Sequence, residues 1–122
     1  MQPSIITDSS GELAQLRHKI RWGEEPDNPL LITYWLAHEN QLAEPSRELL
    51  RQRYESQFIL LLETVVDELV IAQWRCLCLD NIYRPLQSLK HISDSARSDN
   101  QIQRLIRELA MQSRYVRHSL CF

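Results

Sequence analysis

Glycine is scarce in this chain: only Gly11 and Gly23 occur among its 122 residues. Tight hairpins between β-strands usually need glycine, because their turns require positive φ angles. The prolines lie at positions that would separate helices rather than interrupt them: Pro3, Pro26, Pro29, Pro45 and Pro85. The sequence therefore predicts an all-α fold.

A full set of disulfide partners and a secretory leader are also missing. The three cysteines, Cys76, Cys78 and Cys121, are an odd number, so at least one thiol stays unpaired within the chain. No charged-then-apolar leader with a small-residue cleavage site opens the sequence. Both features favour a reducing, cytoplasmic location. The net charge of −2 and the pI near 6.1 argue against a strongly basic, dedicated nucleic-acid-binding protein.

The most apolar part of the chain is "FILLLETVVDELVIAQWRCLCL", which runs from Phe58 to Leu79 and has 16 apolar residues among 22. Four charged residues interrupt it: Glu63, Asp67, Glu68 and Arg75. Each would cost about 2.5–3.5 kcal/mol near the centre of a bilayer. The run is therefore predicted to be a buried helix of a folded domain and not a membrane span.

The absence of glycine and proline from Ser46 to Arg84 predicts a long central hydrophobic helix. An unbroken helix over residues 46–80 would be roughly 50 Å long, whereas a compact domain of this size is only about 35 Å across. Either the helix bends, near residue 56 or 80, or another chain covers it. Since two-fold dimers are the commonest soluble oligomers, we predict a homodimer.

Capping signals divide the chain into a flexible tail, residues 1–8, and a single α-helical domain, residues 9–122. About five helices are expected, packed around the long one as a helical bundle. The signals at predicted helix ends are Ser9 with Glu12, Gly23, Ser46 with Glu48, and Ser98 with Gln101. The last helix is expected from about Asp99 towards His118.

This last helix has two contrasting faces. One face is apolar, and the other gathers Arg104, Arg107, Arg114, Arg117 and His118. The chain carries a charge of +2 from residue 94 onward but −4 over residues 1–45. Three interpretations remain open: a solvated face, a stripe that binds a phosphate backbone or an acidic protein surface, and a stripe that pairs with the acidic third of a second copy.

Part of the same helix, "LIRELAMQSRYVRHSL", resembles the helix-turn-helix of bacterial DNA-binding regulators. In this resemblance "ELA" ends the first helix, "MQS" is the turn and "RYVRHSL" is the recognition helix. Ala110 stands where glycine is common. The resemblance implies that Arg114, Arg117 and His118 face the major groove of DNA. A continuous amphipathic helix explains the same residues.

No pattern points to catalysis or to a bound metal or cofactor. Cys76 and Cys78 are two residues apart, so on a helix their side chains point about 200° from each other and cannot easily hold one ion. Glycine-rich phosphate loops and Gly-x-Ser-x-Gly elbows are missing. The sequence predicts neither an enzyme nor a site for a small-molecule substrate.

The resulting prediction is a non-enzymatic cytoplasmic interaction protein, such as a small regulator, adaptor or chaperone, that acts through helix-mediated protein–protein contacts. The alternative is a dimeric DNA-binding transcriptional regulator that uses residues 104–120. The salt dependence of binding distinguishes the two hypotheses, because affinity for DNA falls steeply with salt as counterions are released.

Overall fold

The computed structural model describes the backbone of residues 4–120 and the side chains of residues 11–116. This part of the chain is helical and contains no strand, which confirms the all-α prediction. A single residue, Ile82, separates the fourth helix from the fifth. The helices are α1 (Ser4–Trp22), α2 (Leu31–Asn40), α3 (Arg47–Val66), α4 (Ala72–Asn81), α5 (Tyr83–Ile92) and α6 (Ala96–Leu120).

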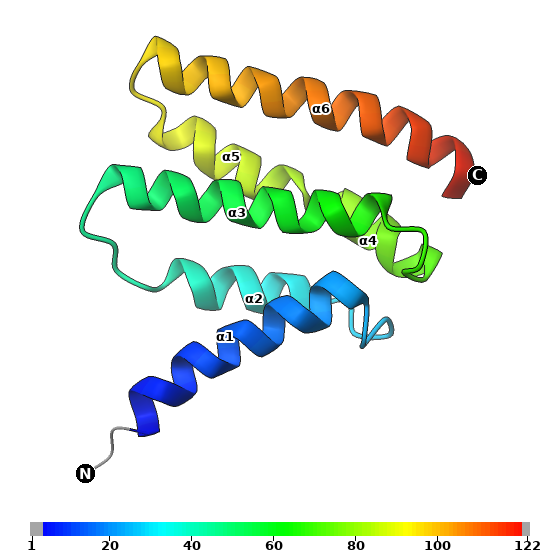
Figure 1. The fold of residues 1–122 in the computed structure, drawn as a ribbon, viewed down its shortest axis with the longest axis horizontal. Helices are drawn as coiled ribbons and strands as arrows, with labels where there is room; N and C mark the ends of the chain where they lie inside the picture. The colour runs from blue at the N-terminus through cyan, green and yellow to red at the C-terminus, as the bar shows by residue number, and fades with distance from the viewer. Residues whose placement is uncertain (1–3, 121–122) are drawn as a thin grey trace.

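Helix α3 lies in the middle of the molecule, with α1 and α2 on one side and α6 on the other (Figure 1). It contacts α1, α4, α5 and α6. The buried residues of all six helices and of the loop before α4 form one hydrophobic cluster. Its largest fully buried side chains are Trp35, Trp74 and Phe58, from α2, α4 and α3.

The hydrophobic run from Phe58 to Leu79 is not one rod, because α3 ends at Val66 and α4 starts at Ala72. Asp67 ends α3. Its carboxylate accepts hydrogen bonds from the backbone N–H of Leu69 at 2.9 Å and from the guanidinium of Arg21 at 2.8 Å. Both interactions hold the pKa of Asp67 below its usual value. The predicted bend near residue 56 is wrong, because α3 is continuous there, whereas a second break, at Ile82, lies close to the predicted position 80.

Arg75 stabilises this break from the other side. Its buried side chain donates a 2.9 Å hydrogen bond to the carbonyl of Val65. That carbonyl is one of the four at the end of α3 that have no partner within the helix. A charged residue inside an apolar run therefore serves as the C-terminal cap of the preceding helix.

The break lets a single chain bury half of the 16 apolar residues of the hydrophobic run. Eight of its apolar residues are buried, while Leu69 (91% exposed) and Ile71 (52%) project from the loop between α3 and α4. The expectation that a second copy must cover a continuous rod thus loses its geometric basis. Among the described residues, no helix combines the length and apolarity needed to cross a bilayer.

The end of α1 follows the sequence prediction, but its start does not. Gly23 has φ +61°, and the hydrogen bonds Gly23 N–H to Ile20 O and Glu24 N–H to Lys19 O make a Schellman motif. At the other end α1 begins at Ser4, so residues 4–8, which were predicted to belong to a tail, are helical and Ser9 lies inside the helix. Residues 4–10 contain no proline, which lets the helix continue to Ser4, just after Pro3.

Serine caps two later helices. Ser46 accepts a hydrogen bond from the N–H of Leu49 at 3.2 Å, as predicted. Helix α6 starts at Ala96, three residues before the expected position. Its cap is Ser95 and not Ser98, because the side chain of Ser95 accepts a hydrogen bond from the backbone N–H of Ser98 at 3.1 Å. Ser98 is buried and shares a hydrogen bond with Ser95.

Candidate interaction surface on the last helix

Helix α6 runs without a break from Ala96 to Leu120, so the helix-turn-helix is wrong. The segment expected to form the turn, Met111–Ser113, is helical. The side chain of Gln112 donates to Glu108 one turn earlier, at 3.0 Å. Without a glycine at residue 110, nothing in the local sequence forces the helix to end there.

One narrow face attaches α6 to the rest of the molecule. Ile102, Leu109 and Val116 are buried and recur every seven residues, and Leu105 and Ile106 pack beside them. These contacts join α6 to α3, α4 and α5. The predicted apolar face is confirmed for these five residues, whereas the side chain of Leu120 lies outside the described residues.

The opposite side of α6 faces solvent. We define the α6 outer face as Arg104, Arg107, Met111 and Arg114, which are all exposed. Their spacing of three or four residues puts them on one side of the helix. Met111 is 62% exposed, and Tyr115 beside this face is 72% exposed. The remaining predicted site residues, Arg117 and His118, belong to α6, but their side chains lie outside the described part of the chain.

The lysine and arginine side chains fall into two groups, those that have an ion-pair or hydrogen-bond partner within the described part of the chain and those that have none there. Every lysine and arginine between residues 11 and 84 has an ion-pair or hydrogen-bond partner, namely Arg17, Lys19, Arg21, Arg47, Arg51, Arg53, Arg75 and Arg84. From residue 85 to 116 the described basic side chains have no such partner. Among the side chains the structure describes, none there pairs with a carboxylate or hydrogen-bond acceptor: Lys90, Arg97, Arg104, Arg107 and Arg114.

A buried polar network that sequence reasoning missed joins α1, α2 and α3. The carboxylate of Glu39 accepts from two nitrogens of Arg17, at 2.8 and 2.9 Å, and from the side chain of Gln57 at 2.9 Å. The indole N–H of Trp35, one turn before Glu39, donates to the same carboxylate at 3.2 Å. Of this network, the sequence shows only that Trp35 and Glu39 are four residues apart and so lie on the same side of a helix. Each of these N–H donors has an acceptor, whereas the buried Oε1 of Gln57 has no hydrogen-bond partner among the described residues. We assign the network to stability.

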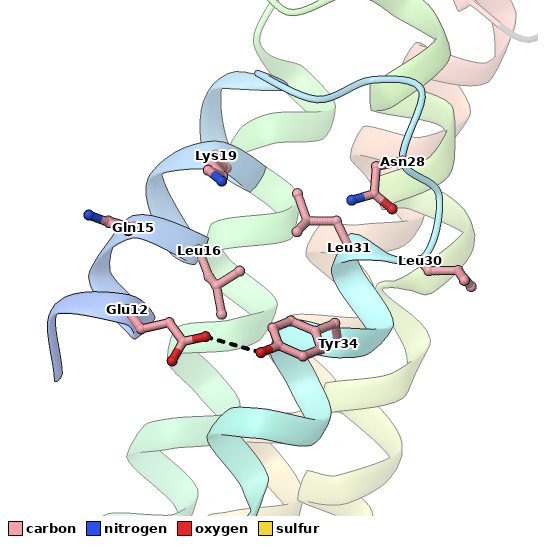
Figure 2. A pocket seen from close by; sticks show the side chains of 8 residues that line it. All are labelled: Glu12, Gln15, Leu16, Lys19, Asn28, Leu30, Leu31 and Tyr34. Atoms are coloured by element: carbon pink, nitrogen blue, oxygen red, sulfur yellow. Dashed lines mark hydrogen bonds between the residues drawn. The ribbon is translucent and has the colours of Figure 1, made fainter. Parts of the chain in front are cut away.

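A hollow of about 450 Å³ lies between α1 and α2 (Figure 2). Most of its polar side chains already have partners: Glu12 accepts from Tyr34 at 3.0 Å, and Lys19 pairs with Glu25 at 2.8 Å. The hydrogen bond to Glu12 raises the pKa of the Tyr34 hydroxyl. His38 stacks on the Tyr34 ring and lies 3.5 Å from Glu12. These groups hold α1 against α2 and leave few polar atoms for a ligand.

The thiols do not form a metal site with other residues in the described part of the chain. No group of three or more histidine, cysteine, aspartate or glutamate side chains there could hold a metal ion. Cys78 is buried, and desolvation raises the pKa of its thiol to about 12. A thiol with such a pKa is a poor nucleophile at neutral pH.

Comparisons of the chain with known protein families, curated proteins and solved structures find no match. The arrangement of the α6 outer face and of the partnered and unpartnered arginines is therefore the basis for a functional conclusion. An arginine that stabilises the fold has its acceptor within the chain. The four arginines of α6 whose side chains the structure describes, Arg97, Arg104, Arg107 and Arg114, have donor capacity to offer to another molecule.

Proposed function

We propose that the protein is a non-enzymatic, cytoplasmic interaction protein that binds an acidic surface of a partner protein through the α6 outer face. The observation that carries this proposal is the separation of partnered from unpartnered cations. The eight basic residues from 11 to 84 all have partners within the chain, and three of the five without a partner lie on this face.

The side chains between these arginines favour a protein as the partner. Met111 and Tyr115 are largely exposed beside the arginines. Protein interfaces are enriched in arginine, tyrosine and methionine and depleted in lysine. Guanidinium groups form two-pronged hydrogen bonds with carboxylates, while the flexible methionine adapts to an apolar surface. An acidic helix with some apolar residues would provide both the carboxylates for the arginines and the apolar surface for Met111.

DNA is the alternative ligand for the same arginines. The unbroken α6 removes the recognition helix that a helix-turn-helix would have inserted into the major groove. The net charge of −2 also disfavours non-specific attraction to a polyanion. We therefore keep DNA binding as an outcome of the test.

We expect the double substitution Arg107→Glu and Arg114→Glu to weaken partner binding about 100-fold or more, because it replaces two attractive contacts by repulsive ones. Both side chains are exposed and have no partner among the described residues, so folding should be unchanged by circular dichroism. The measurement is affinity purification from the native host with each variant as bait. Titration with the purified partner follows.

Lys90→Glu is the matched control, because Lys90 is exposed on α5 and also has no partner among the described residues. It should retain the partner that the double substitution loses. Equal retention by both variants would rule out the α6 outer face as the binding surface. Nuclease-sensitive material that is retained only at low salt would instead favour DNA.

We further propose that the protein forms a homodimer through the loop between α3 and α4. Asp67 holds this loop in a conformation that projects Leu69 (91% exposed) and Ile71 (52%) away from the core. Val66 is also partly exposed beside them. Exposed aliphatic side chains gathered on one loop are typical of the apolar centre of an interface.

The double substitution Leu69→Ser and Ile71→Ser is expected to convert the dimer into a monomer. The stability of the monomer should not decrease, because neither side chain is buried. Sedimentation equilibrium measures the mass directly, and Leu42→Ser, at the exposed end of α2, controls for the loss of surface leucine. A wild-type mass of 14.5 kDa at high concentration would exclude the homodimer.

A further inference from the structure

A large hollow lies between the amino-terminal halves of α3 and α6. These two helix ends lie on the same side of the molecule (Figure 1). The hollow has a volume of about 960 Å³ and is lined by Arg51, Arg97 and Arg104, by one carboxylate, Glu48, and by four residues with hydroxyl or amide side chains. Three guanidinium groups from two helices therefore surround one space.

The charges around this hollow do not cancel. Glu48 is ion-paired with Arg51 on the same helix, whereas Arg97 and Arg104 have no partner in the described part of the chain. Two other carboxylates near the start of α6 do not line the hollow: Asp94, which pairs with Arg47 at 3.5 Å, and Asp99, which accepts a hydrogen bond from the uncharged Ser93. The lining thus has a net charge of +2, from three arginines and one glutamate.

We propose that this hollow binds a phosphate monoester. At neutral pH such a group carries about −1.5 to −2 charges and three acceptor oxygens, which match the net charge and the donors of the lining. A carboxylate or a phosphodiester carries only one charge and would leave the site positive. Guanidinium groups suit this ligand, because their paired N–H groups fit two phosphate oxygens.

The hollow has room for a phosphate that is attached to a larger molecule. A volume of about 960 Å³ exceeds that of a phosphate group and leaves room for what is esterified to it. The serine and amide side chains of the lining can donate to that part of the ligand. A phosphorylated protein side chain and a phosphorylated small molecule both provide this chemistry.

This site goes beyond the proposed protein contact and can be tested apart from it. Arg104 belongs to both surfaces, but Arg97 and Arg51 are not part of the α6 outer face, and Arg107 and Arg114 do not line the hollow. Arg97→Gln should therefore affect the phosphate ligand, while changes at residues 107 and 114 should affect the protein partner.

The test is an NMR titration of the intact protein in which the arginine Nε–H signals are followed. Phenyl phosphate and inorganic phosphate should bind saturably and shift the signals of Arg97 and Arg104. Dimethyl phosphate, a diester with one charge, should bind at least about tenfold more weakly. The double substitution Arg97→Gln and Arg104→Gln should lower the affinity for phenyl phosphate by at least about tenfold.

The matched control is Arg107→Gln with Arg114→Gln, which removes the same charge from the same helix and should leave phosphate binding unchanged. A phosphoserine peptide that binds more tightly than phenyl phosphate would identify a protein source, and the reverse order a small molecule. Equal affinity for the diester, equal losses in both double variants, or non-saturable binding at millimolar concentrations would each overturn the proposal.

Discussion

Replacing Glu39 by alanine is expected to lower the free energy of unfolding by about 3–5 kcal/mol. Glu39 is only 6% exposed, and its carboxylate accepts four hydrogen bonds, from Arg17, Trp35 and Gln57. Without it, the partly exposed guanidinium of Arg17 and the fully buried amide of Gln57 lose a shared acceptor. Since small domains are stable by only about 5–15 kcal/mol, this loss is a large part of the total.

Urea denaturation followed by circular dichroism measures this effect. Glu39→Gln keeps the shape of the side chain but removes the charge, so it should cost less than the alanine variant. Glu12→Ala is the control on the surface, because Glu12 accepts a hydrogen bond from the exposed Tyr34. It should cost no more than about 1 kcal/mol. A similar, small loss for Glu39→Ala would show that the network adds little to stability.

The features predicted correctly from the sequence depend on residues close together in the chain. Gly23 ends α1 because only the local backbone must adopt a positive φ, and Ser46 starts α3 through a hydrogen bond three residues away. In each case the physical cause acts within one turn of helix.

The break after α3 could not be predicted in this way. Asp67 ends the helix with the help of Arg21, which is 46 residues earlier in the chain. The helix has no glycine or proline there, so local propensity favours its continuation. The expected long helix was wrong because a contact between distant residues outweighed that propensity, and the prediction of a covering second copy depended on the same error.

The candidate surface was predictable in part. Helical spacing alone put Arg104, Arg107 and Arg114 on the side opposite the apolar face, and the structure has them exposed. Which arginines have partners could not be predicted, because Arg17 and Glu39 are 22 residues apart in the chain. The hollow lined by Arg51, Arg97 and Arg104 was missed for the same reason, since it joins two helices distant in sequence.

Trp74→Ala is the second substitution with a large expected effect, a loss of about 3–5 kcal/mol. Trp74 is fully buried, and its indole N–H donates a 2.7 Å hydrogen bond to the carbonyl of Ile20. This carbonyl lies in the last turn of α1. The ring also fills the space beside Gly23, where an added Cβ would lie 3.0 Å from the ring. Removing it leaves a cavity between α1 and α4, and the carbonyl of Ile20 keeps only its 3.3 Å hydrogen bond from the N–H of Gly23.

Two further variants separate these contributions in urea denaturation. Trp74→Phe keeps most of the apolar volume and removes the hydrogen bond, so it should cost less than alanine but more than about 1 kcal/mol. Trp22→Ala is the control, because Trp22 is 47% exposed at the end of α1 and contacts Arg21. A Trp74→Ala protein as stable as the Trp22→Ala protein would mean that α4 does not hold α1 in place. The Schellman motif at Gly23 would then have to end α1 without tertiary support.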